Sequence, residues 1–245
     1  MKRSLPQPVA KKARKKRGVV RASKRSNLVL FDLDHTLLNG DSDVMWCEFL
    51  IARGVLKADE FAARNADMDT RYKAGTVGLQ EFADFYVGTL AGRTPAEWEP
   101  LRQDFLATQI VPRIGRAAIS LVQRHLDEGH LVVMTTATNR FITELTALYL
   151  DIEHLIATEP ALGEDGRFTG RATGVLNMRD GKVARLHQWL AARGLQFSQF
   201  KTTAYSDSIN DLPLLSAVRH PYVVDADPRL AAEAAQRGWK ALSLR

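Results

Sequence analysis

Cysteine is almost absent from this 245-residue sequence: Cys47 is the single one, so no internal disulfide can form. No apolar run approaches the roughly 20 residues that cross a bilayer, and the first residues lack the apolar segment of a secretory signal. Scarce cysteine is typical of proteins from reducing compartments. We therefore expect a cytoplasmic protein that does not contact a membrane.

Acidic residues are missing from residues 1–26, which hold eleven Lys or Arg. The chain has 34 basic and 28 acidic residues, so the part beyond residue 26 is mildly acidic. Dense like charge without aromatic residues predicts that residues 1–26 form a disordered basic tail. We interpret the tail as a solubilising extension. The alternative is an arm that binds nucleic acid by counterion release.

Short apolar runs alternate with longer segments of helical periodicity from residue 27 onward. The predicted strands are Leu28–Phe31, Leu131–Met134, Leu155–Ala157, Thr202–Tyr205, Tyr222–Val224 and Ala241–Leu244. The predicted helices are Ile114–Glu128, Arg140–Leu150, Lys182–Arg193, Pro213–Val218 and Pro228–Arg237. Apolar strands separated by helices are typical of a parallel sheet covered on both faces. We therefore predict an α/β fold with a doubly wound, Rossmann-like parallel sheet.

One connection is far longer than a crossover needs. About a hundred residues separate the first strand from the strand at Leu131, whereas a crossover needs about a dozen. Segments such as LQEFADFYVGTLAG and PAEWEPLRQDFLATQI place apolar residues near helical spacing. We predict an inserted helical cap at 40–112 and an α/β core at 27–39 and 113–245. Such a cap would cover the ligand site at the carboxyl ends of the strands.

Four polar stretches follow predicted strands or open predicted helices. They are Asp32-Leu33-Asp34-His35-Thr36, VVMTTATN with Thr136, RDGKVARL with Lys182, and AYSDSINDLPLL with Asp207 and Asp211. Each stretch alone has an ordinary interpretation, such as a turn or a helix cap. Thr135 and Thr138 compete with Thr136 for the strand end, and Lys201 competes with Lys182. Together the four stretches indicate one site.

The residue types at these positions suit phosphate chemistry. The carboxylates of Asp32, Asp34 and Asp207 are oxygen ligands that suit Mg²⁺. A hydroxyl and an ammonium group, from Thr136 and Lys182, suit phosphate oxygens. An aspartate can attack phosphorus to give an aspartyl-phosphate. A second carboxyl two residues on can protonate the leaving alkoxide and then deprotonate the hydrolytic water.

In this order, DLDHT, the Thr136 strand, Lys182 and SDSIND resemble the four motifs of the haloacid dehalogenase superfamily over most of residues 27–245. The helical cap between the first two motifs resembles the phosphoserine phosphatase-like subgroup, subfamily IB. The ending PYVVDADPRLAAEAAQRGWKAL is similar to bacterial phosphoserine and histidinol-phosphate phosphatase-like proteins. The resemblance implies a Mg²⁺-dependent phosphatase that acts on a small phosphomonoester through an aspartyl-phosphate.

The resemblance also implies roles for the acidic residues. Asp32 would be the nucleophile and a metal ligand. Asp34 would be the acid and base, and its backbone carbonyl would bind the metal. Asp207 would be the acidic metal ligand, and Asp211 would orient the water shell of the metal or Lys182.

The phosphate group has its own residues in this family. Thr136, Lys182 and Asn210 would bind phosphate by resemblance, and Lys182 would also shield the charge of Asp32. The acid at position 34 narrows the reaction, because the dehalogenase branch lacks an acid there and the transport ATPases carry Thr. A carboxyl at this place favours a phosphomonoesterase or a phosphomutase.

Two departures from phosphoserine phosphatases concern the substrate. Asp41 stands where those enzymes carry a glutamate that contacts the substrate amine, and Asp84 and Tyr86 stand where an arginine would hold the carboxylate. These departures argue against phosphoserine itself. A histidinol-phosphate phosphatase or a phosphotransferase on the same fold are alternatives. A nucleic-acid-associated protein acting through residues 1–26 is an alternative of another class. The sequence does not indicate an oligomeric state.

Overall fold

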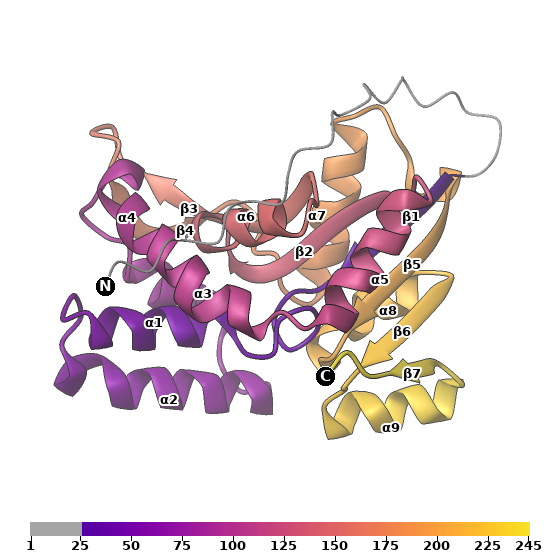
Figure 1. The fold of residues 1–245 in the computed structure, drawn as a ribbon, viewed down its shortest axis with the longest axis horizontal. Coiled ribbons are helices and arrows are strands. Elements are labelled where there is room, and N and C mark those ends of the chain that lie inside the picture. The colour runs from indigo at the N-terminus through magenta and orange to yellow at the C-terminus, as the bar shows by residue number, and fades with distance from the viewer. Residues whose placement is uncertain (1–25) are drawn as a thin grey trace, which may run out of the picture.

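Residues 26–245, which the computed structural model describes, form a seven-stranded sheet in the order β4-β3-β2-β1-β5-β6-β7 (Figure 1). The strands are β1 Ser26–Phe31, β2 Leu131–Asn139, β3 His154–Leu162, β4 Phe168–Thr173, β5 Phe200–Ser206, β6 His220–Val224 and β7 Lys240–Leu242. Every pairing is parallel except that of β4 with β3. The α/β prediction and all six predicted strands are confirmed.

Helices cover both faces of the sheet. They are α5 Arg116–Asp127, α6 Arg140–Tyr149, α7 Asp180–Ala191, α8 Leu212–Ala217 and α9 Pro228–Arg237, with short 3₁₀ turns η3 Phe197–Gln199 and η4 Ile209–Asp211. Alternate residues of β1 point to opposite faces. Val29 and Phe31 pack in the cluster that contains α5 and α6, whereas Leu28 and Leu30 pack against α7, α8 and α9. The sheet is therefore doubly wound, as predicted.

The long connection after β1 is helical. It contains α1 Ser42–Ala52, α2 Ala58–Ala74, α3 Leu79–Gly88 and α4 Pro95–Phe105, followed by a π-helix, η1 Leu106–Ile110, and a 3₁₀ turn, η2 Val111–Arg113. We call Ser42–Arg113 the helical insert. Trp46, Phe49, Phe105 and Trp98 are buried in it and form edge and stacked ring contacts with centroids 5.1 to 5.8 Å apart. These rings fix how α1 packs against α4.

Two features differ from the expectations. The strand β4 was not predicted, because it is a short edge strand whose residues alternate between partly buried and exposed and include Gly170. The predicted tail lies outside the described residues except for Ser26, which begins β1 instead of ending the tail.

No single helix of residues 26–245 is both long and apolar enough to span a membrane. The segments Pro95–Arg113 and Arg116–Asp127 reach the required length and composition only as a pair, which is bent by 97°.

Candidate active site

The carboxyl ends of β1, β2 and β5 meet beneath the helical insert, around a cavity of about 500 Å³. Its floor comes from the core and includes Asp32, Asp34, Thr138, Lys182, Asp207 and Asp211. Its roof includes Tyr72, Lys73 and Phe82 from the insert and Asp41, the residue that immediately precedes the insert. The four predicted motifs, which are far apart in the sequence, therefore meet at one edge of the sheet. We use "floor" and "roof" for these two residue sets below.

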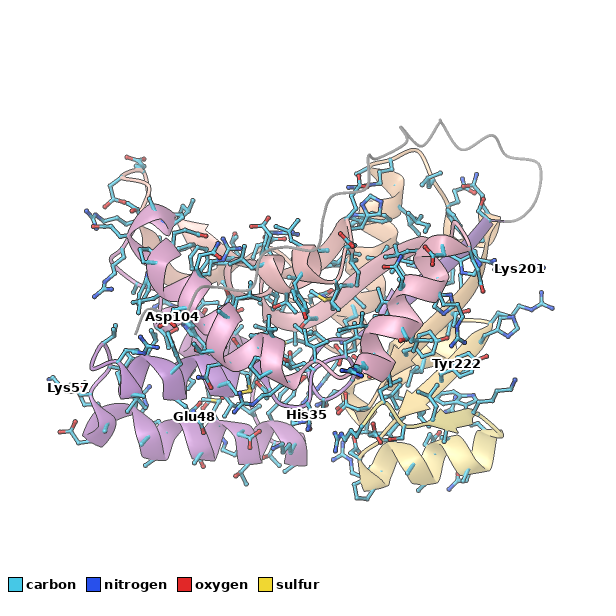
Figure 2. The ribbon with its side chains drawn as sticks, viewed as in Figure 1. His35, Glu48, Lys57, Asp104, Lys201 and Tyr222 are labelled. Atoms are coloured by element: carbon cyan, nitrogen blue, oxygen red, sulfur yellow. The ribbon has the colours of Figure 1, made fainter. Side chains whose placement is uncertain are left out.

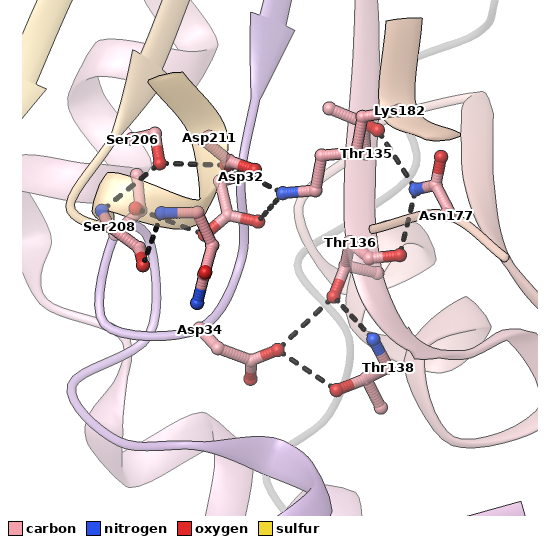
Figure 3. A network of polar contacts seen from close by, with 12 residues as sticks. Asp32, Asp34, Thr135, Thr136, Thr138, Asn177, Lys182, Ser206, Ser208 and Asp211 are labelled. Carbon is pink, nitrogen blue, oxygen red and sulfur yellow. Dashed lines mark hydrogen bonds and ion pairs between the residues drawn. The ribbon is translucent and has the colours of Figure 1, made fainter. Parts of the chain in front are cut away.

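Lys182 lies between two buried carboxylates (Figure 3). Its Nζ donates to Asp32 Oδ1 at 2.7 Å and to Asp211 Oδ2 at 2.6 Å. The Ser206 hydroxyl donates to the same Asp211 oxygen at 2.8 Å. All four side chains are at least nine-tenths buried, so the lysine is held rigidly against Asp32. The predicted tie from Asp211 to Lys182 is present as a direct ion pair.

The floor holds more acid than base. Burial raises the pKa of Asp32 to about 7, although the charge of Lys182 opposes this rise. Burial also raises the pKa of Asp207 well above its usual range. Burial alone would lower the pKa of Lys182, but the charges of Asp211 and Asp32 outweigh it and raise the value. The lysine therefore stays charged, and negative charge remains in surplus.

Asp32 and Asp207 are brought together by a shared hydroxyl. Thr36 Oγ1 donates to Asp207 Oδ1 at 2.9 Å and lies 3.3 Å from Asp32 Oδ2. The backbone N–H of Asp207 donates to this Thr36 oxygen at 3.1 Å. A pair of buried carboxylates with raised pKa values is a donor set that fits a hard divalent cation. Such a cation would offset the surplus negative charge.

Asp34 accepts four hydrogen bonds. The backbone N–H and the hydroxyl of Ser42 donate to Oδ1 at 2.7 and 2.6 Å. The hydroxyls of Thr136 and Thr138 donate to Oδ2 at 3.1 and 3.0 Å. Ser42 opens α1, so the first residue of the insert holds this carboxyl in place. The carboxyl is thereby fixed at the boundary between floor and roof.

The predicted strand end at Thr136 is wrong, because β2 continues to Asn139. Thr136 is fully buried, and its hydroxyl already donates to Asp34 and accepts from the backbone N–H of Thr138 at 3.1 Å. Thr138 lines the cavity. Of the competing threonines, Thr138 is therefore the one with its side chain at the cavity wall, and Thr136 supports Asp34.

Asn210 lies beside the floor. Its Oδ1 accepts from Arg179 Nε at 3.3 Å, and its backbone N–H donates to Ser208 Oγ at 3.2 Å. Its predicted contact with phosphate stays a prediction. The competing lysine, Lys201, is exposed near the start of β5, far from the insert (Figure 2). Of these two candidates, Lys182 is the one that lines the cavity.

The roof combines aromatic rings with a half-buried acid, Asp41. The rings of Tyr72 and Phe82 stack with centroids 4.3 Å apart. Asp41 accepts from the backbone N–H groups of Asp43 and Val44, both at 3.0 Å, and so caps α1. Burial, and next the charge of Asp34, raises the pKa of Asp41 to about 8. Among residues 26–245, no cationic side chain forms an ion pair with Asp41, so a positively charged ligand would supply such a partner.

Several supporting residues were not predicted from the sequence. Ser42 and Ser206 hold the carboxyls of Asp34 and Asp211, and Thr36 joins Asp32 to Asp207. Their positions in the sequence could have predicted this role, because each lies within two residues of a motif aspartate or of the helix cap Asp41. Tyr72 could not be predicted in this way, since it comes from a helix whose facing side is not readable from the sequence.

Comparisons with known proteins agree with this geometry. The family described as haloacid dehalogenase-like hydrolases matches residues 29–216, which include all four motifs. A histidinol-phosphatase of Neisseria meningitidis serogroup C is 38% identical over 220 residues, covering 89% of this chain and 99% of that protein. A phosphoserine phosphatase of Mycobacterium tuberculosis is 31% identical over 218 residues, covering 86% of this chain and 68% of that protein.

Solved structures share the whole fold. A protein of unknown function from Bordetella pertussis Tohama I has a TM-score of 0.85 at 40% identity, covering 90% of this chain and 99% of that chain. A substrate-bound phosphoserine phosphatase complex has a TM-score of 0.65 at 16% identity, covering 90% of this chain and 94% of that chain. The second likeness shows a common fold, including the helical insert.

Proposed function

Since the chain belongs to the haloacid dehalogenase-like hydrolase family and is a phosphatase of its phosphoserine phosphatase-like group, we propose that it hydrolyses histidinol phosphate with the help of Mg²⁺. The coarser statement, a phosphatase for a small phosphorylated metabolite, follows from the family and its relatives. One observation carries the substrate proposal: among its described residues, the cavity offers aromatic surface and a carboxyl, Asp41, that accepts hydrogen bonds only from backbone N–H groups.

Asp32 is the proposed nucleophile. One of its carboxylate oxygens attacks phosphorus, the bond to the substrate oxygen breaks, and an aspartyl-phosphate forms. Lys182, fixed by Asp211, lies 2.7 Å from Asp32 Oδ1 and offsets negative charge as the phosphoryl group arrives. We propose that the same lysine also binds a phosphoryl oxygen.

Asp34 is the proposed acid and base. It gives a proton to the leaving alkoxide in the first step and takes a proton from water in the second. The water oxygen then bonds to phosphorus, which releases inorganic phosphate and restores Asp32. The hydrogen bonds from Ser42, Thr136 and Thr138 hold the carboxyl in one position for both steps.

Asp32, Asp207 and the backbone carbonyl of Asp34 are the proposed Mg²⁺ ligands. The support is the donor set: two buried carboxylates that share the Thr36 hydroxyl and carry raised pKa values. When bound, Mg²⁺ would withdraw electron density from the phosphoryl group and offset the negative charge of the floor.

The bases at the cavity argue against a substrate carboxylate. Lys73 pairs with Asp69 at 2.7 Å, and Lys182 pairs with two aspartates. Arg229 donates to the carbonyl of Ala74 at 3.1 Å, and Arg245 lies 3.7 Å from a carboxylate. A substrate carboxylate would have to displace the carboxylate partner of Lys73, Lys182 or Arg245, whereas Arg229 contacts only a backbone carbonyl. Phosphoserine has a carboxylate next to its amine, whereas histidinol phosphate has none.

The position at which phosphoserine phosphatases carry an arginine also argues against a substrate carboxylate. Asp84, which stands where a base was sought, accepts from the backbone N–H of Ala172 at 3.0 Å and does not line the cavity. Tyr86 is buried inside the insert. On the roof, Asp41 would pair with the substrate ammonium, and the rings of Tyr72 and Phe82 offer apolar surface to the imidazole.

The test is phosphate release from a panel of metabolites. Histidinol phosphate, phosphoserine, sugar phosphates and nucleotides are each assayed with Mg²⁺ and with a chelator. We expect histidinol phosphate to exceed phosphoserine at least tenfold in kcat/KM. The Asp32→Asn variant should lose at least about a thousandfold in kcat, and chelation should abolish turnover.

Three outcomes would contradict parts of the proposal. A preference for phosphoserine would reject the substrate while keeping the reaction. Transfer of phosphate to added alcohols faster than to water would identify a phosphotransferase. Full activity in Asp32→Asn would reject the proposed nucleophile.

A further inference from the structure

A second group of metal-ligating side chains lies away from the cavity. Among residues 26–245, His125, Glu128 and His130 each offer one donor atom within 4.8 Å of the other two. They come from one short segment, the end of α5 and the turn into β2. Because the donors are so close in sequence, assembling them costs little chain entropy.

The two imidazole rings face each other through their Nδ1 atoms. His125 Nδ1 and His130 Nδ1 are 2.8 Å apart, with ring centroids 5.1 Å apart. Without a metal, one ring donates a hydrogen to the lone pair of the other. Two nitrogens bound to one tetrahedral Zn²⁺ at about 2.0–2.1 Å would be about 3.4 Å apart. The rings therefore need to separate by only about 0.6 Å to admit an ion.

The outer nitrogens of both rings already have partners. His125 Nε2 lies 3.0 Å from the hydroxyl of Tyr205, whose ring is stacked between Phe31 and Tyr222. His130 Nε2 lies 2.6 Å from the amide nitrogen of Asn27, which donates to it, and 3.3 Å from Glu128 Oε2. A hydroxyl or carboxylate that accepts from the outer N–H of a histidine directs its inner lone pair toward a metal. The Tyr205 hydroxyl can give His125 this support.

We propose that His125 Nδ1 and His130 Nδ1, with Glu128, form a site for a borderline divalent cation such as Zn²⁺. On binding, the ion takes the place of the hydrogen that the two Nδ1 atoms share, and this hydrogen moves to His130 Nε2, so no proton need be released. The Asn27 amide, whose nitrogen lies 2.6 Å from His130 Nε2, then turns its oxygen toward the ring to accept this hydrogen. Water would complete the coordination. Burial lowers the pKa of His125, which keeps this ring in the neutral form that binds metals.

The site differs from the catalytic one in position and chemistry. His130 immediately precedes β2 and contacts Asn27 near the start of β1, its Nε2 lying 2.6 Å from the amide nitrogen. Asp32 follows the other end of β1, five residues or about 16 Å along the strand. Two imidazoles favour Zn²⁺, Co²⁺ or Ni²⁺, whereas the oxygen ligands of the floor favour Mg²⁺. The ion would tie α5 to the amino ends of β1 and β2.

The experiment uses the tag-free full-length protein with Asp32→Asn and Asp207→Asn, which removes metal binding at the cavity. Co²⁺ is titrated and its visible absorption recorded, and Zn²⁺ is then added as a competitor. We expect one equivalent of Co²⁺ to bind, Zn²⁺ to displace it, and Zn²⁺ to raise the melting temperature by several degrees. Absence of a stoichiometric Co²⁺ signal would overturn the proposal.

Variants assign the ligands. His130→Gln should weaken Co²⁺ binding at least tenfold, and the milder, exposed Glu128→Gln should weaken it severalfold. His187→Gln, an exposed histidine on α7, is the matched control and should leave binding unchanged. In the otherwise unaltered enzyme, His130→Gln should keep its Mg²⁺-dependent activity. Binding that is equal in all these proteins would reject the site.

Discussion

The floor and the roof of the cavity are built in opposite ways. On the floor, Lys182 and Asp211 are buried and bound to partners at 2.6 to 2.8 Å. On the roof, Tyr72 and Phe82 offer ring surface, and Asp41 is half-buried and, within residues 26–245, accepts hydrogen bonds only from backbone N–H groups. The side chains of the floor are held in place for one reaction, whereas the rings and the carboxyl of the roof can still bind a ligand. The reaction and the substrate are therefore set by different parts of the chain.

This difference lowers the stability of the folded chain on the floor but not on the roof. Carboxylates on the floor lose hydration without gaining enough positive charge, as the raised pKa values of Asp32 and Asp207 indicate. The roof is stabilised by ordinary apolar packing between α2 and α3, as the ring pair of Tyr72 and Phe82 illustrates. Substitutions on the floor should therefore change both stability and turnover, whereas those on the roof should change substrate binding.

The largest expected effect comes from Lys182→Met. It leaves Asp32 and Asp211 buried without their cation, so the free energy of unfolding should fall by about 3–5 kcal/mol at pH 7.5. The value of kcat should fall by roughly a thousandfold. Chemical denaturation and phosphate release measure the two effects. Lys201→Met, on an exposed lysine, is the control and should change neither.

A smaller effect is expected from pH in the presence of a chelator. The pKa of Asp32 is raised from 3.8 to about 7 in the folded chain, chiefly by burial. A raised pKa means that this contribution to stability is complete below pH 4 and is lost as pH rises through 7. The loss should reach at most about 4 kcal/mol. Adding Mg²⁺ at pH 7.5 should restore it.

The comparison of wild type with Asp32→Asn isolates this contribution. Asparagine does not titrate, so the variant should gain stability relative to wild type as the pH is raised from 4 to 7 under chelation. Denaturant midpoints at each pH provide the measurement. Parallel pH profiles for the two proteins would mean that Asp32 stays ionised on the floor.

The floor was largely predictable from the sequence. Asp32 and Asp207 follow apolar strands, and parallel strands place their carboxyl ends at one edge. The order and spacing of the motifs therefore predict that they meet at this edge. What failed was local detail: β2 runs past Thr136, so Thr138 reaches the cavity wall and Thr136 does not. Three threonines within four residues, Thr135, Thr136 and Thr138, do not reveal where a strand bends or shifts register.

The roof was predictable only as helices. Residues 58–74 form α2, but which of its sides meets the cavity depends on how α2 packs against α1 and α3. Tyr72 was therefore not predicted as a cavity residue, although the aromatic content of the insert was plain. Asp41 was identified by its place after the first motif. That no cationic side chain of residues 26–245 pairs with it is known only from the structure.

A roof substitution of intermediate effect is Asp41→Asn. Asparagine keeps the cap of α1 but cannot pair with an ammonium group. The KM for histidinol phosphate should rise about 10- to 100-fold, since a charged hydrogen bond contributes about 1.5–3 kcal/mol, while kcat should change less than threefold. A phosphate ester without an amine is the control substrate and should show no change in KM. Equal losses for both substrates would place Asp41 in the reaction.

The smallest effect is expected where the roof meets the core. Arg229, at the start of α9, donates to the carbonyl of Ala74 at the end of α2. Arg229→Ala removes this contact, worth about 0.5–1 kcal/mol at an exposed site, so KM should rise about two- to fivefold with kcat nearly unchanged. Arg237→Ala, on the same helix but paired with Glu233, is the control. A hundredfold loss of kcat in Arg229→Ala would contradict the division of roles between floor and roof. The roof would then have to be held in place for the chemistry itself and not only for binding the substrate.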